Sequence, residues 1–96
     1  MVDNLICMDS IRHFGEDYVR TICMEECAEL IQAISKSVRY PDDPIRRDAV
    51  TEEMADVTIC IEYLMQLYGV PEQEMQDKID FKQQRTVKRL SDDGRA

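Results

Sequence analysis

The positions of helix-breaking residues constrain this chain most. Its three glycines and three prolines leave three long uninterrupted segments between them. Proline in a helix interior removes a backbone hydrogen bond and glycine weakens a helix by about 1 kcal/mol, so both mark helix boundaries. Apolar residues recur at helical spacing in each segment, and no segment alternates like a β-strand. The sequence therefore predicts an all-α fold with helices over about 16–39, 44–68 and 71–90.

Local signals refine these boundaries. Asp43 is suited to cap the second long helix, and Pro44 is suited to its first position. Gly69 is placed to end the same helix. Residues 3–13 are loosely periodic and predict a short leading helix, whereas 91–96 are expected to form a frayed tail. The prediction is a compact helical bundle of three main helices and one short one.

A chain of 96 residues and 11.2 kDa is one domain in length. We expect a single domain over 1–96, with its core in about 14–90. A domain of this size buries only about two thirds of its surface, so oligomerisation is expected to complete it. No apolar run approaches the roughly 20 residues of a membrane span, and residues 1–15 lack the features of a signal peptide.

The amino-acid composition limits the kinds of partner that the protein can bind. Twelve basic and twenty acidic residues give a net charge of −8, which argues against binding to duplex nucleic acid or to anionic membranes, because both rely on Lys and Arg. The four cysteines, at positions 7, 23, 27 and 60, are expected to be buried free thiols rather than disulfides or metal ligands. We expect a cytoplasmic protein.

The first long segment carries an acidic stripe beside its apolar face. At 100° per residue, Glu25, Glu26 and Glu29 lie together along one edge of that face. The face itself comprises Val19, Cys23, Cys27, Leu30, Ile31, Ile34 and Val38.

The second long segment carries two carboxylates on the face expected to pack. Glu53 lies in the middle of an apolar arc, and Asp56 lies at its margin. An unpaired buried charge is costly unless its pKa shifts or a cation neutralises it. Glu26 and Glu29 are three residues apart, as are Glu53 and Asp56, so antiparallel packing would bring four carboxylates together.

A hard divalent cation suits such an all-oxygen cluster, with Mg²⁺ or Mn²⁺ favoured. The only histidine, His13, lies outside both acidic motifs, so the Glu-x-x-His arrangement of di-iron bundles is missing. Two alternatives stay open. The carboxylates could form a solvated face, or they could pair with Lys and Arg from another helix.

The third long segment carries a ridge of four basic residues that fall on one face. Residues 78–90 hold five basic residues and one acidic residue, whereas 1–70 hold six basic and fourteen acidic residues. Lys and Arg bind phosphate oxygens, so the ridge and the carboxylates together predict a metal–polyphosphate site. A solvated face with buried aliphatic stems is the alternative. The basic ridge consists of Lys78, Lys82, Arg85 and Arg89.

The spacing of the acidic motifs resembles a known signature. The segment 25–29 (EECAE), followed after 23 residues by 53–56 (EMAD), is similar to the EExxE…ExxD pattern of the MazG-like all-α nucleoside triphosphate pyrophosphohydrolases. The flanking sequences MEECAELIQAISK and VTEEMADV are typical as well, and the resemblance extends over about 14–90. It implies a helical bundle that assembles as a dimer or a dimer of dimers. It also implies Mg²⁺-dependent cleavage of nucleoside triphosphates between the α and β phosphates.

The resemblance also implies roles for individual residues. The catalytic carboxylates would be Glu25, Glu26, Glu29, Glu53 and Asp56, and the last four of these would bind the metal. Glu25 would be a further ligand or the base for the attacking water. The phosphate-binding residues would be Lys78, Lys82 and Arg85.

Other functions share parts of this pattern. A phosphoribosyl-ATP pyrophosphohydrolase or a dUTPase-like enzyme would use the same carboxylates and differ in base selectivity. A non-catalytic acidic bundle that binds a partner protein is the alternative outside enzymology. The expected partners are therefore a nucleoside triphosphate and further copies of the chain, as a homodimer or homotetramer, with no nucleic acid and no membrane.

Overall fold

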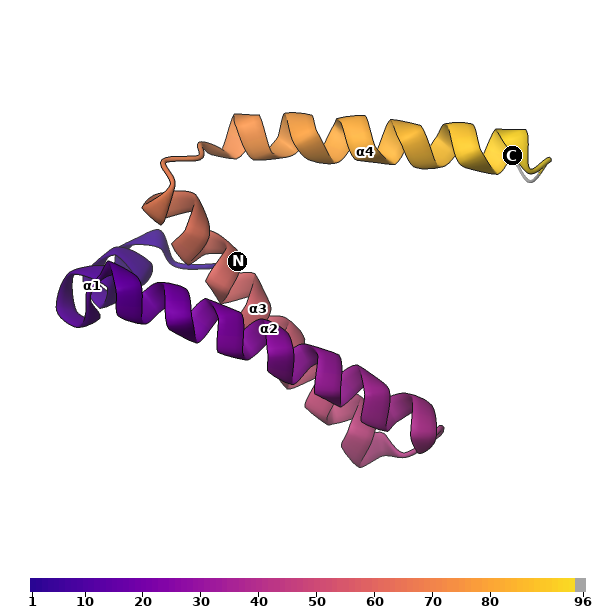
Figure 1. Cartoon of the computed structure of the whole chain (residues 1–96), viewed down its shortest axis with the longest axis horizontal. Coiled ribbons are helices and arrows are strands. Elements are labelled where there is room, and N and C mark those ends of the chain that lie inside the picture. The colour runs from indigo at the N-terminus through magenta and orange to yellow at the C-terminus, as the bar shows by residue number, and fades with distance from the viewer. Residues whose placement is uncertain (95–96) are drawn as a thin grey trace.

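The structure, a computed structural model, describes residues 1–94 and consists of four helices (Figure 1). They are α1 (Asn4–Phe14), α2 (Glu16–Arg39), α3 (Pro44–Leu67) and α4 (Glu72–Asp92). The predicted all-α bundle is confirmed, and residues 1–94 contain no strand. A frayed tail was predicted for 91–96, but α4 continues to Asp92, so the first two of these residues are helical. Residues 95–96 lie outside the described part of the chain.

Side chains at the helix ends explain the boundaries. The Asp43 carboxylate accepts a hydrogen bond from the Ile45 backbone N–H at 2.9 Å, and Pro44 occupies the first position of α3. Asp3 caps α1 in the same way. Gly69 follows α3 with a φ of 64°, the left-handed conformation that glycine adopts most easily after a helix. The predicted cap, first position and stop of the second long helix are confirmed.

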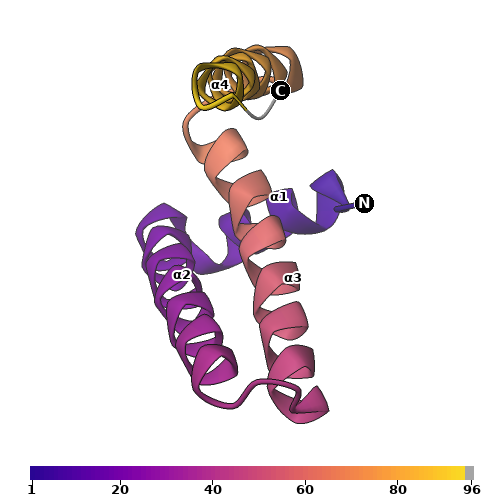
Figure 2. The same ribbon diagram turned by 90° about the vertical axis from the view of Figure 1, so that its right-hand side faces the viewer.

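Helices α2 and α3 lie side by side as an antiparallel hairpin, and α1 packs against both (Figure 2). Helix α4 extends away from this group and forms no comparable interface with any other described helix (Figure 1). The radius of gyration is 16.6 Å, compared with about 12.5 Å for a compact chain of this length. The packed part of the bundle is therefore α1–α3. None of the helices in the described chain is long and apolar enough to cross a membrane.

The core is small and lies where α1 meets the hairpin. Val19, Cys23 and Cys60 are buried at its centre, and the Cys23 thiol donates a hydrogen bond to the Cys60 carbonyl at 3.7 Å. Three cysteines are buried free thiols, as predicted, but the same prediction for Cys27 is wrong, because that side chain is exposed. Half-buried apolar side chains complete this core: Ile11, Tyr63, Leu64 and Leu67.

The predicted apolar face of α2 is only partly covered. Ile31 is 68%, Ile34 46% and Val38 72% exposed, because α3 packs only along the edge of this face that carries Val19 and Cys23, together with Ala33 beyond that edge. Met54 and Ile61 of α3 are also exposed. They share one face of α3, and in an antiparallel pair this face lies on the same side of the hairpin as Ile31, Ile34 and Val38. We call these five residues the apolar strip: Ile31, Ile34, Val38, Met54 and Ile61.

Candidate metal centre

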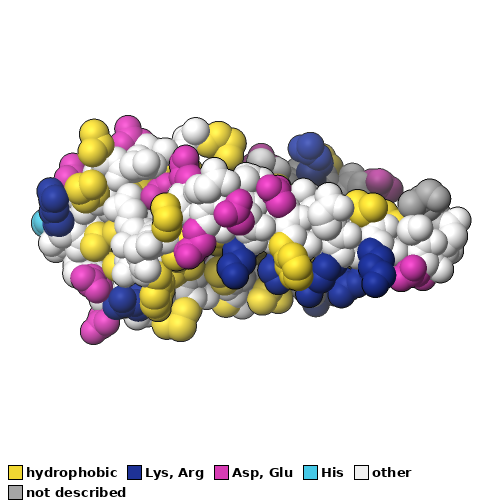
Figure 3. Space-filling view, turned by 90° about the horizontal axis from the view of Figure 1, so that it is seen from above, with side chains coloured by type: hydrophobic (Ala, Val, Ile, Leu, Met, Phe, Trp, Pro, Cys, Tyr) yellow, Lys and Arg dark blue, Asp and Glu magenta, His cyan; other side chains and the backbone are white. Residues whose placement is uncertain are grey.

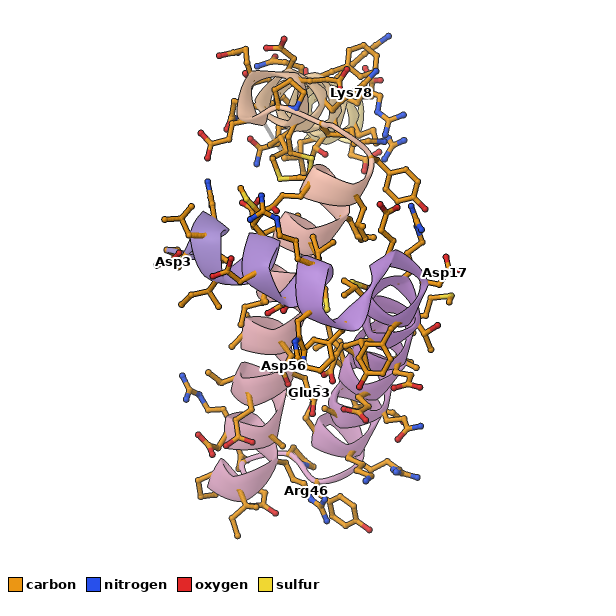
Figure 4. All side chains as sticks on the ribbon, turned by 90° about the vertical axis from the view of Figure 1, so that its left-hand side faces the viewer. Asp3, Asp17, Arg46, Glu53, Asp56 and Lys78 are labelled. Atoms are coloured by element: carbon orange, nitrogen blue, oxygen red, sulfur yellow. The ribbon has the colours of Figure 1, made fainter. Side chains whose placement is uncertain are left out.

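The packing of α2 on α3 places acidic residues between the two helices. Glu26 shares the covered face of α2 with Cys23 and Ala33. Glu53 shares the covered face of α3 with Cys60, two turns away. Because the helices are antiparallel, the two glutamates meet near the middle of the hairpin, where Figure 4 labels Glu53 and Asp56.

Three carboxylates converge there. One oxygen from each of Glu26, Glu53 and Asp56 lies within 4.8 Å of the other two. Glu26 and Glu53 are half-buried, and Asp56 is exposed at the margin, as the helical wheel of α3 predicts. Oxygens that bind Mg²⁺ at about 2.1 Å lie about 3–4 Å apart, so small side-chain rotations bring all three to one ion. We call these three residues the carboxylate triad.

Two atoms of the triad have unmet bonding capacity. Glu26 Oε2 and Glu53 Oε2 are buried and accept no hydrogen bond from any residue in 1–94. Within residues 1–94 the ion pairs involve only Arg20 and Arg46 as cations, and neither pairs with the triad. The alternative of neutralisation by Lys or Arg is therefore not realised in the described chain. The set of oxygens fits a hard divalent cation.

The triad is electrostatically strained without a cation. Burial, followed by the negative charges of Asp56 and Glu29, raises the pKa of the Glu26 carboxyl to about 7. Burial also raises the pKa of Glu53, and Glu29 and Asp56 are the next causes. A proton on Glu26 relieves this repulsion in the free protein, and a bound cation would relieve it by displacing that proton.

The other predicted site residues lie in different places. Glu29 lines a cavity of about 270 Å³ together with Glu53, directly beside the triad. Glu25 is exposed on α2 and does not belong to the triad. The basic ridge lies on α4 and therefore does not meet the carboxylates within one chain. Figure 3 shows Lys and Arg side chains gathered along α4, and Figure 4 shows Lys78 far from Glu53.

Two basic residues beside the triad were missed by the sequence reasoning. Lys36 of α2 and Arg46 of α3 line the same cavity as Glu29 and Glu53. A usable signal existed, because Lys36 follows Glu29 by seven residues and Arg46 precedes Glu53 by seven. Seven residues are close to two helical turns, so each cation lies on the same helix face as its glutamate.

A larger cavity lies near the turn between α2 and α3. It has a volume of about 730 Å³, and its lining includes Tyr40, Arg47, Val50 and Met54. None of the five motif carboxylates lines it. It shares Met54 with the apolar strip and no lining residue with the smaller cavity beside the triad.

Comparisons with known proteins add no relative to this picture. No protein-family model matches the chain, and searches of curated proteins and of solved structures found no match. Function is therefore inferred from the residues themselves. A half-buried oxygen cluster beside two cations can hold a divalent ion and the phosphate groups that the ion carries.

Proposed function

We propose that this protein is a Mg²⁺-dependent nucleoside triphosphate pyrophosphohydrolase of the MazG-like type, with Mn²⁺ as a substitute ion. The observation that carries the proposal is the convergence of Glu26, Glu53 and Asp56 at a half-buried position where two carboxylate oxygens lack partners. In the reaction, the oxygen of water bonds to the α-phosphorus and the bond from that phosphorus to the α–β bridging oxygen breaks. The products are a nucleoside monophosphate and pyrophosphate.

The residues divide this work between them. Glu26, Glu53 and Asp56 would hold the ion, and Glu29, which lines the adjacent cavity with Glu53, would be a further ligand. The bound ion supplies Lewis-acid polarisation of the phosphoryl group. Glu26, whose pKa is raised to about 7, would have to lose its remaining proton for the ion to bind. Glu25, exposed on the same helix as Glu26 and Glu29, would accept the proton of the attacking water.

Pyrophosphate release across a panel of ribo- and deoxyribonucleoside triphosphates, with Mg²⁺ and with EDTA, tests this proposal. We expect Mg²⁺-dependent release from at least one substrate. Glu53→Gln should lower kcat by roughly 100-fold or more, the scale of losing one charge-stabilising group, while the neighbouring exposed Glu52→Gln should not. If neither Mg²⁺ nor Mn²⁺ supports release from any substrate, the proposal fails and a non-catalytic bundle is favoured. The panel includes dUTP and phosphoribosyl-ATP, which identify the two related enzymes.

The functional protein is proposed to be a homodimer or homotetramer. The apolar strip is larger than a single exposed side chain and spans two helices, a feature of interaction surfaces. Charge favours a second copy as the occupant, because residues 78–90 carry a net positive charge and 1–70 carry the negative charge. Helix α4 of one copy, with Lys78, Lys82 and Arg85, is then free to approach the acidic hairpin of another.

Light scattering coupled to gel filtration measures this assembly. Ile34→Glu places a charge within the apolar strip and should shift the mass toward that of a protomer. Ile45→Glu is the matched control, since Ile45 is 75% exposed at the start of α3 and outside the strip. A wild-type mass of 11.2 kDa at micromolar concentration would contradict the assembly and leave the metal site unaffected.

A further inference from the structure

The cavity of about 270 Å³ that opens beside the carboxylate triad contains both signs of charge. Its acidic end holds Glu53, which belongs to the triad, and Glu29. Its other end holds Lys36 from α2 and Arg46 from α3, and Gln32 adds an amide. At about 30 Å³ per water molecule, the cavity has room for a diphosphate group with some of its hydration.

Lys36 and Arg46 both have N–H groups that can donate hydrogen bonds to a ligand. The Arg46 Nε–H is buried and donates no hydrogen bond to any residue in 1–94; its ion pair with Asp43 is long, at 3.9 Å. The Arg46 guanidinium lies over the Tyr40 ring, 5.0 Å from its centroid, which holds the group in place. Lys36 forms no ion pair with any residue in 1–94. Its helix directs the side chain toward the N-terminus of α2, and therefore toward Glu29.

The acidic residues determine which anion can enter. A free phosphate would be repelled by Glu29 and Glu53, which line the same cavity. A phosphate that arrives with a divalent cation has its charge reduced where it meets these carboxylates, and its outer oxygens remain available to Lys36 and Arg46. The order of charges along the hairpin, acids first and cations toward the turn, matches a metal–diphosphate chelate.

We infer that Lys36 and Arg46 form a subsite for the diphosphate part of a metal-bound polyphosphate, in the cavity between α2 and α3. This inference rests on the proposed function and specifies which residues bind the departing pyrophosphate. It assigns that role to the same protomer that holds the metal, rather than to the basic ridge on α4.

Calorimetric titration with inorganic pyrophosphate tests the subsite, because this probe is a product and is not turned over. Wild-type protein should bind Mg²⁺ alone and Mg²⁺–pyrophosphate more tightly, but not pyrophosphate in EDTA. Lys36→Gln and Arg46→Gln should each weaken Mg²⁺–pyrophosphate binding about tenfold, the value of a charge-assisted hydrogen bond, and leave the Kd for Mg²⁺ alone within about twofold.

Matched controls separate this effect from general loss of charge. Arg39→Gln changes a cation that lies with Lys36 in the last turn of α2. Arg47→Gln changes the residue next to Arg46, and Arg47 lines the larger cavity instead. Neither should weaken binding. Arg46→Lys should recover only part of the affinity, since Lys keeps the charge but loses the planar fork. Thermal melting of each variant identifies any variant that fails to fold. If Arg46→Gln fails to fold, Lys36→Gln still tests the subsite, because Lys36 is exposed.

The outcomes distinguish this inference from the proposed function. Unchanged Mg²⁺–pyrophosphate affinity in Lys36→Gln and Arg46→Gln overturns the subsite and leaves the proposed enzyme standing. Loss of affinity in Lys78→Gln or Lys82→Gln instead also overturns it and places the phosphates on α4 of another copy. A wild-type protein that binds neither Mg²⁺ nor its pyrophosphate complex, and releases no pyrophosphate, ends both proposals.

Discussion

Replacing Glu26 by Gln should stabilise the metal-free protein and remove its response to Mg²⁺. The Glu26 carboxyl has a pKa of about 7, raised from an ordinary 4.5, so the folded state retains a proton that the unfolded chain has already lost. Stability contributed by this proton is present below about pH 4.5 and is lost as pH rises toward 7. Above pH 7 the wild type carries the full penalty of a crowded negative charge, whereas Gln has the same shape without it.

The raised pKa sets the size of the effect. A shift of this extent corresponds to at most about 3–4 kcal/mol, and water around the half-exposed triad screens it to about 1–2 kcal/mol. At pH 8 in EDTA, Glu26→Gln should therefore raise the free energy of unfolding by about 1–2 kcal/mol. For a domain of this size, each kcal/mol raises Tm by about 4–8 °C. At pH 5 the two proteins should melt much closer together, because Glu26 is then mostly protonated in the folded state.

Saturating Mg²⁺ should reverse the order of stability. A ligand at 100 times its Kd stabilises the folded state by about 2.7 kcal/mol, and only the wild type retains all three carboxylates of the triad. Differential scanning calorimetry at pH 5 and 8, with and without Mg²⁺, measures all four conditions. Glu52→Gln is the control, since Glu52 contributes least among the causes that raise the Glu53 pKa. A Glu26→Gln variant that is less stable than wild type in EDTA at pH 8 would refute the electrostatic reasoning.

Three further variants test the packing that holds the triad. Val19→Ala removes methyl groups from a side chain that is 3% exposed and should cost about 2 kcal/mol by urea unfolding; a loss under about 0.5 kcal/mol would mean that this small core contributes little. Asp43→Ala removes the cap of α3 and should cost about 1 kcal/mol, whereas Asp42→Asn should not, because Asn also tolerates the φ of 67° at that position. Gly15→Ala places a Cβ on backbone with a φ of 92° and should cost about 1–3 kcal/mol although no atom clashes with it; an unchanged Tm would show that α1 and α2 tolerate a different junction.

Local chemistry made much of this fold predictable from the sequence. Asp43 and Gly69 mark helix ends because capping and a positive φ depend on the residue itself and its nearest neighbours. The position of Glu53 on a covered face was also predictable, since the apolar residues around it repeat with the helical period. The convergence of Glu26 with Glu53 required one further assumption, antiparallel packing, which short connections favour.

The remaining features depend on which faces meet, and periodicity does not encode this. The apolar side chains of Ile31 and Val38 suggested a buried face, yet α3 covers only the edge of that face that carries Val19 and Cys23. Cys27 is exposed for the same reason. The role assigned to Lys78 assumed that the last helix returns to the hairpin, and nothing in its own sequence specifies where it packs. Lys36 and Arg46 could have been found from their seven-residue offsets from Glu29 and Glu53, had the antiparallel hairpin been used to search for cations as well as acids.

The separation of the apolar strip from the triad allows assembly and chemistry to coexist. If Ile34 and Met54 pack against a second copy, the covered area grows on one side of the hairpin while the cavity lined by Glu53 and Lys36 stays open on the other. The small core around Val19 gives a single protomer little apolar burial, so such packing would add stability where the chain needs it. A carboxylate triad that weakens the metal-free hairpin is tolerable under these conditions, because the proposed partner and ion each stabilise the same pair of helices.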